Sequence, residues 1–154
     1  PKPVPVWYDL GRFRKTLKRA SMIEQAARRI LLVDGDSRVR DALRMLFDCE
    51  PGLTLVAESA NARKLVKNAR EHKPDIILLD WDSAQCIAEP LLSSLHQISS
   101  HLRIIVLSGR SESETQALQA GADFFVSKTD PPDALLGTIR ALVKLDVQQK
   151  GEAV

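Results

Sequence analysis

Four short apolar runs of the sequence are followed by polar side chains that could handle a phosphoryl group. These side chains are, in order along the chain, Asp34 and Asp36, Asp80 and Asp82, Ser108, and Lys128. A carboxylate that attacks a phosphoryl donor needs a divalent cation to neutralise the phosphoryl oxygens, and a hydroxyl or an ammonium to hold them. Clustered carboxylates likewise favour a bound cation, and an all-oxygen ligand set favours Mg²⁺ over zinc. The residue types therefore predict carboxylate phosphorylation with Mg²⁺, provided that the fold brings them together.

The apolar runs that precede these side chains are predicted to be strands of one parallel sheet. From Arg29 onward, β-branched and leucine-rich runs alternate with helical patterns, which is typical of α/β proteins. The runs cover residues 30–33, 53–57, 76–79, 104–107 and 124–126. Five such units predict a flavodoxin-like, doubly wound (βα)5 parallel sheet with strand order 2-1-3-4-5. In that order the carboxyl ends of the strands meet at one edge, where ligands bind.

Residues typical of helix N-caps mark where three of the helices should begin. Asp36 or Ser37 is placed to cap the first helix, Asn61 the second, and Asp130 the last, with Pro131 as its first residue. These boundaries agree with the strand pattern, and five βα units result.

Length and composition are those of one globular domain with a short appendage. The chain has 154 residues, of which 44% are apolar and 27% charged, which excludes a disordered or fibrous protein. No apolar run approaches the roughly 20 residues that span a bilayer, and the first residues lack the apolar core of a signal peptide, so we expect a cytoplasmic protein. Cys49 and Cys86 have no metal-ligand or disulfide spacing, and we expect both to be small buried side chains.

The joint pattern resembles the receiver domains of two-component response regulators. The matching segments are Ile30-Leu31-Leu32-Val33-Asp34, Pro74-Asp75-Ile76-Ile77-Leu78-Leu79-Asp80, Leu107-Ser108-Gly109 and Gly121-Ala122-Asp123-Phe124-Phe125-Val126-Ser127-Lys128. The resemblance implies that Asp80 is the phosphoacceptor, and that Ser108 is the switch hydroxyl, Phe125 the switch aromatic and Lys128 the phosphate-binding lysine. Residues 50–58 and 128–133 are similar to the NarL/LuxR-type subgroup, whose members usually carry a helix-turn-helix domain as well.

The resemblance also implies a Mg²⁺ site, held by Asp34, Asp80 and the backbone carbonyl of Asp82. The family has a second acid directly after the first, as the direct metal ligand, whereas this chain has Gly35. Asp36 or Asp82 could replace the missing carboxylate. For Asp36 we favour the role of helix N-cap, whereas Asp82 could act on the metal through water or lie in a solvated loop. In either case we expect a lower metal affinity than is usual in the family.

Two functions stay open for such a chain. In the first, a histidine kinase or phosphotransfer protein phosphorylates Asp80, and the domain is a phosphorylation-dependent switch in a phosphorelay. Its output would be transcription regulation, another downstream protein or homodimerisation, and it would be a phosphoacceptor rather than a conventional enzyme. In the second, Gly35 has abolished competent metal binding, and a pseudo-receiver acts as a phosphate-independent interaction module. A flavodoxin-like cofactor binder is a third reading, but the chain lacks the Ser/Thr-rich phosphate loop after the first strand.

The pattern divides the chain into a basic N-terminal extension (1–28), a receiver domain (29–145) and a C-terminal tail (146–154). Residues 1–29 hold eight Lys or Arg and two acidic residues, a net charge of +6, so the rest of the chain carries −4. The residues after 145 are too few for a helix-turn-helix, and we therefore expect no direct nucleic-acid binding by this chain.

The N-terminal extension has an amphipathic pattern. Its apolar residues recur at helical spacing among lysines and arginines, and they are Trp7, Leu10, Phe13, Leu17 and Ala20. Such a segment could bind an anionic surface, a partner protein, or the acidic body of the chain itself. A solvated extension without function is the simpler interpretation, and the sequence slightly favours it.

Overall fold

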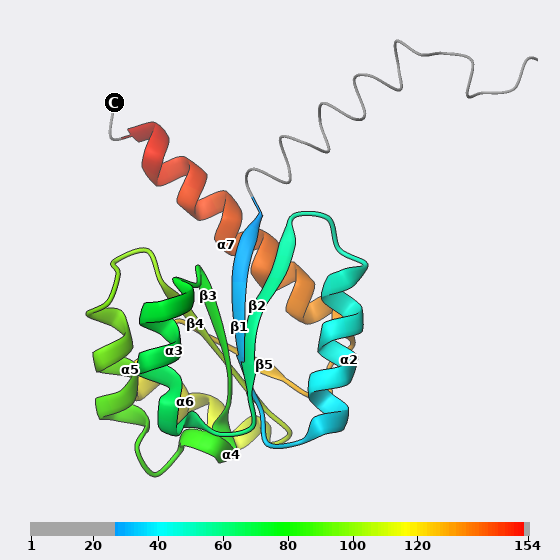
Figure 1. The fold of residues 1–154 in the computed structure, drawn as a ribbon, viewed down its shortest axis with the longest axis vertical. Helices are drawn as coiled ribbons and strands as arrows, with labels where there is room; N and C mark the ends of the chain where they lie inside the picture. The colour runs from blue at the N-terminus through cyan, green and yellow to red at the C-terminus, as the bar shows by residue number, and fades with distance from the viewer. Residues whose placement is uncertain (1–26, 153–154) are drawn as a thin grey trace, which may run out of the picture.

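A parallel sheet with helices on both faces forms the centre of the molecule (Figure 1). The computed structural model describes residues 27–152, so the amphipathic segment of the N-terminal extension lies outside the described residues. The strands are β1 (Arg28–Val33), β2 (Leu53–Ser59), β3 (Ile76–Asp80), β4 (Arg103–Ser108) and β5 (Phe124–Ser127). Their order is β2-β1-β3-β4-β5 and all pairs are parallel, which confirms the predicted topology.

Helices cover both faces of this sheet, with α2 and α7 on one face and α3, α5 and α6 on the other (Figure 1). Their bounds are α2 (Ser37–Asp48), α3 (Leu65–His72), α4 (Trp81–Ala84), α5 (Ala88–His96), α6 (Glu114–Gln119) and α7 (Pro132–Glu152), with 3₁₀ turns η2 (Ala62–Lys64) and η3 (Ser111–Ser113). Strand side chains alternate between the two faces. Ile30 and Leu78 join Phe47 of α2 in one apolar cluster, whereas Leu31 and Leu79 join the cluster on the opposite face. Double coverage explains the continuously apolar runs of β1, β3 and β4.

Side-chain caps start two helical segments as predicted. The Oδ1 atom of Asp36 accepts a hydrogen bond from the backbone N–H of Arg38 at 2.9 Å, and Asn61 caps η2 in the same way. The last helix differs from the prediction at both ends. It begins at Pro132, one residue later than expected, and it continues to Glu152, so the predicted tail is helical over 146–152.

The expectation that Cys49 and Cys86 are buried was wrong, because both are exposed. Cys49 is the C-cap of α2, and Cys86 lies in the short connection between α4 and α5. At both places the chain leaves a helix, so the side chain no longer follows the apolar face that packs on the sheet. None of the helices described over 27–152 combines the length and the apolar character needed to cross a bilayer.

Lys73 is expected to strain the end of α3, because it has a left-handed backbone with φ 45° and is not a glycine. We predict that Lys73→Gly raises the free energy of unfolding by about 0.5–1 kcal/mol, since relief of strain outweighs the greater freedom of glycine in the unfolded chain. Lys67→Gly, inside the same helix, should lower it by about 1 kcal/mol. Urea unfolding of both variants measures these changes, and a loss of stability in both would contradict the assigned strain.

Candidate functional site

A buried acidic pocket lies at the carboxyl edge of the sheet. Asp34 directly follows β1 and Asp80 ends β3, two strands that are paired in register, and the two residues are only 1% and 6% exposed. Lys128 follows β5 and reaches across to both of them. Its Nζ atom lies 2.6 Å from Asp34 Oδ2 and 2.7 Å from Asp80 Oδ1. The fold therefore brings together three of the residues predicted for phosphoryl chemistry, and one ammonium bridges two carboxylates.

Burial and ion pairing act in opposite directions on this lysine. Desolvation lowers the pKa of Lys128, but the contacts with the carboxylates of Asp34 and Asp80 outweigh it and raise the pKa above its ordinary value. The lysine is therefore a permanent cation of the pocket at neutral pH. Two carboxylates against one ammonium still leave a net negative charge, which suits a further cation.

The second oxygen of Asp80 is held by Ser83. Asp80 is the N-cap of α4, and its Oδ2 atom accepts hydrogen bonds from the backbone N–H of Ser83 at 3.2 Å and from the Ser83 hydroxyl at 2.8 Å. The sequence reasoning assigned no role to Ser83. The signal that could have found it is a hydroxyl residue three positions after an acid at a predicted strand-to-helix junction. Both oxygens of the candidate nucleophile are thus oriented by protein groups.

Ser108 and Phe125 lie on β4 and β5, the two strands that follow β3 in the sheet. Ser108 ends β4, is 1% exposed, and its Oγ atom accepts a hydrogen bond from the backbone N–H of Arg110 at 3.1 Å. Its carbonyl accepts from the backbone N–H of Lys128 at 2.8 Å, which ties the lysine loop to β4. Phe125 is half-buried in β5 and packs against the cluster that contains α3, α5 and α6. Ser108 therefore lies at the carboxyl edge with its hydroxyl engaged, and the switch roles of Ser108 and Phe125 stay predictions.

The two other acidic residues at this edge, Asp36 and Asp82, form ion pairs with arginines. Asp36 caps α2 and pairs with the Arg38 guanidinium at 2.9 Å, and hydrogen bonding to that arginine lowers the pKa of Asp36 to about 2. Asp82 is exposed and pairs with Arg110 at 2.5 Å. The role of Asp36 as helix N-cap is confirmed. Among the described residues, neither carboxylate pairs with Lys128, which bridges Asp34 and Asp80. Neither therefore replaces the carboxylate that is missing at Gly35.

The remaining groups offer a small but suitable set of oxygen ligands for Mg²⁺. Among the described residues no three His, Cys, Asp or Glu side chains are grouped closely enough to hold a metal by themselves. Asp34 Oδ2 is nevertheless buried without a hydrogen-bond partner there, since its contact with Lys128 has the distance of an ion pair but not hydrogen-bond geometry. Mg²⁺ is commonly held by one or two carboxylates plus water and phosphate oxygens. Asp34 and Asp80 can meet that requirement.

Comparison with known proteins identifies the class. The family model described as "Response regulator receiver domain" matches residues 30–140, so the chain belongs to the receiver domains of two-component response regulators. Family members typically bind Mg²⁺ and are phosphoacceptors for histidine kinases.

Similar proteins of known name indicate the subgroup within this family. The nitrate/nitrite response regulator NarL of Escherichia coli K12 is 32% identical over 117 residues, 75% of this chain and 54% of NarL. The chemotaxis protein CheY of Bacillus subtilis is 31% identical over 115 residues, 73% of this chain and 95% of CheY. The crystal structure of a LuxR-family response regulator from Aurantimonas sp. SI85-9A1 superposes with a TM-score of 0.68 at 30% identity, over 77% of this chain and 86% of that one. The predicted likeness to the NarL/LuxR-type subgroup is confirmed, although the chain spans only about half the length of NarL.

Gly35 leaves room for the acid that the family normally has. A Cβ atom at Gly35 would lie 3.6 Å from the Ala60 carbonyl oxygen and 3.8 Å from Ser83 Oγ, both ordinary contacts. Gly35→Asp should therefore fold, add a third carboxylate beside Asp80, and raise the affinity for Mg²⁺ by about ten-fold, the effect of about 1.4 kcal/mol. Calorimetric titration with MgCl₂ measures it. Gly109→Asp is the matched control, since it adds the same charge in open space beyond β4, and equal gains in both variants would show a general charge effect only.

Replacing Lys128 should leave two buried carboxylates without their cation. We predict that Lys128→Met lowers the free energy of unfolding by about 2 kcal/mol at pH 7, whereas Lys144→Met at an exposed site changes it by less than about 0.5 kcal/mol. Because the folded pKa of Lys128 is raised, this contribution is fully present below its unfolded pKa and is lost as pH rises through the folded one. Unfolding curves at pH 7 and in the alkaline range test both points. A difference between wild type and Lys128→Met that grows with alkaline pH would contradict the assignment.

Proposed function

We propose that this chain is a phosphorylation-dependent switch whose phosphoacceptor is Asp80. The observation that carries the proposal is the contact between the buried Asp80 carboxylate and Lys128 Nζ at 2.7 Å, at the carboxyl edge of the sheet. A carboxylate oriented by a cation can accept a phosphoryl group while the ammonium holds the phosphoryl oxygens. Membership in the receiver family supports this role.

The chemistry would proceed by direct displacement at phosphorus. An oxygen of Asp80 would form a bond to the phosphorus of a phosphohistidine, and the P–N bond would break, with its electron pair returning to the imidazole nitrogen of a histidine kinase or phosphotransfer protein. Lys128 and the Ser108 hydroxyl would hold the transferred oxygens. Mg²⁺, when bound by Asp34, Asp80 and the backbone carbonyl of Asp82, would supply charge neutralisation on the phosphoryl group.

The output would be a change of surface around β5. Phosphoryl contacts with Ser108 would favour an inward position of Phe125, which is half-buried beside α6 and so has room to change its packing. The altered face would then bias a downstream protein or a homodimer. Regulation of transcription is the output we favour, since the 32% identical KdpE of Mycobacterium tuberculosis is named a transcriptional regulatory protein. Response regulators generally act in the cytoplasm.

A pseudo-receiver is the second candidate, and two observations favour it. Gly35 stands where the family has a metal-binding acid, and Asp36 and Asp82 are both engaged by arginines instead of compensating for it. In that case the fold would serve phosphate-independent binding of a partner.

Incubation with phosphoramidate distinguishes the two candidates without a partner protein. For the switch we predict an intact-mass increase of one phosphoryl group, dependent on Mg²⁺, in wild type and in Asp82→Asn but not in Asp80→Asn. Asp82 is the matched control because its side chain pairs with Arg110 outside the pocket, while the change of type and charge is identical. Absence of any adduct, with and without Mg²⁺, would overturn the switch and leave the pseudo-receiver.

A further inference from the structure

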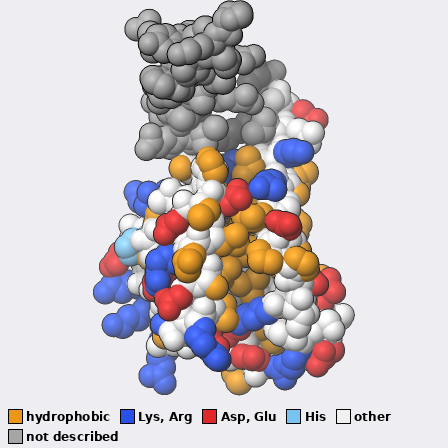
Figure 2. All heavy atoms as spheres, turned by 90° about the vertical axis from the view of Figure 1, so that its right-hand side faces the viewer, with side chains coloured by type: hydrophobic (Ala, Val, Ile, Leu, Met, Phe, Trp, Pro, Cys, Tyr) orange, Lys and Arg blue, Asp and Glu red, His pale blue; other side chains and the backbone are white. Residues whose placement is uncertain are grey.

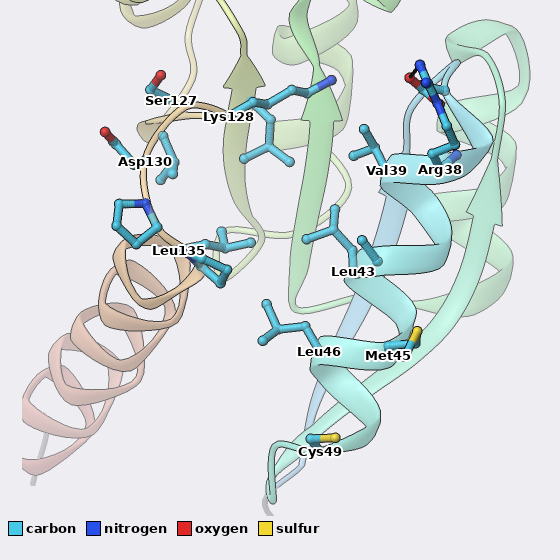
Figure 3. Close-up of a pocket in the computed structure, with 16 residues that line it drawn as sticks. Arg38, Val39, Leu43, Met45, Leu46, Cys49, Ser127, Lys128, Asp130 and Leu135 are labelled. Atoms are coloured by element: carbon cyan, nitrogen blue, oxygen red, sulfur yellow. Dashed lines mark hydrogen bonds and ion pairs between the residues drawn. The ribbon is translucent and has the colours of Figure 1, made fainter.

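An apolar groove runs between α2 and α7. It has a volume of about 720 Å³, and Figure 2 shows hydrophobic side chains gathered in a hollow along this face of the molecule. Val39, Leu43 and Leu46 of α2 point across it toward Leu135 of α7 (Figure 3). Cys49 lies at one end of the groove, and Lys128 at the other. Apolar hollows of this size on a protein surface commonly mark binding sites.

We propose that the groove is the seat of the chain's own N-terminal segment, residues 1–26, bound through Trp7, Leu10, Phe13 and Leu17. These four residues recur at helical spacing, so a helix over them would carry one apolar stripe, and an amphipathic helix of that kind can lie in a groove between two helices. The groove and the stripe on the segment are thus both apolar. The proposal does not depend on phosphorylation of Asp80.

The segment leaves the described domain at the correct end of the groove. The backbone N–H of Arg28, the first residue of β1, donates to the Gly52 carbonyl at 2.7 Å, and Gly52 lies only three residues after Cys49. A helix over residues 7–20 would be about 21 Å long, close to the roughly 18 Å of the α2 helix. The six residues between that helix and residue 27 can extend over about 20 Å, which is ample for the chain to turn back.

This route fixes the direction of the segment. Leu17 would lie toward the Cys49 end, Phe13 near the middle, and Trp7 toward Lys128. The charges of the two parts also favour binding of the segment to the domain. Residues 1–26 hold six basic and two acidic residues, a net charge of +4, and the rest of the chain has a net charge of −2. Opposite net charges favour association, and a tether keeps the effective concentration of the segment high.

The two cysteines allow a test on the full-length chain. Both are exposed in the described domain, but only Cys49 lines the groove, so a seated segment should protect Cys49 and leave Cys86 reactive. Alkylation rates at each cysteine, measured by peptide mass spectrometry, report this protection. We expect Phe13→Asp to raise the rate at Cys49 about ten-fold, as for a segment that is seated about nine-tenths of the time, and to leave Cys86 unchanged.

Tyr8→Asp is the matched control. At about 100° per residue Tyr8 falls on the opposite side of the helix from the apolar stripe, and this change also replaces an aromatic ring by a carboxylate. It should leave Cys49 protected. A Cys49 rate that Phe13→Asp does not change, or that both variants raise equally, would overturn the proposal. Protection that increases with protein concentration would also overturn it, because the occupant would then be a second copy of the chain.

Discussion

The Asp34–Lys128–Asp80 ion group is the constraint on which the carboxyl edge depends. Two carboxylates buried on adjacent strands repel each other and have lost most of their hydration, a combination that costs several kcal/mol unless a cation lies between them. Lys128 supplies that cation from the loop after β5, and its backbone N–H is held by the carbonyl of Ser108. The residue that compensates the two carboxylates is thus the last of the three along the chain.

The sheet makes this arrangement possible because it is apolar on both faces. With α2 and α7 packed on one side and α3, α5 and α6 on the other, the strands cannot shift in register without exposing or clashing core side chains. Asp34, Asp80 and Lys128 therefore meet at a fixed edge although Asp34 and Lys128 are 94 positions apart in the sequence. The same packing leaves α2 and α7 far enough apart to form the groove that ends at Lys128.

Much of this could be predicted from the sequence, because the strands carry an unambiguous signal. Runs such as Ile76–Leu79 are short, apolar and bounded by polar residues, as a doubly covered strand should be, and of the two common strand orders for five parallel strands the flavodoxin-like one fits the length of the chain. The burial of Cys49 and Cys86 was predicted wrongly because the exposure of a residue at a helix end depends on the direction in which the chain leaves the helix. The spacing of apolar residues in the sequence does not encode that direction. Ser83 was missed for a related reason: its hydroxyl gains a partner only once Asp80 becomes the cap of α4.

Gly35 changes the charge balance of the pocket rather than its shape. With a second acid at that position, three carboxylates would face one ammonium, a net charge of −2, and a divalent cation would be needed for the burial itself. Here Lys128 lowers the charge of the two carboxylates from −2 to −1, so the resting pocket is close to neutral without a metal. Phosphorylation would add further negative charge at Asp80, and the demand for a cation would then arise mainly with the phosphoryl group. A lower metal affinity at rest is therefore compatible with a phosphoacceptor, since two carboxylates and the phosphoryl oxygens together form a ligand set that Mg²⁺ accepts.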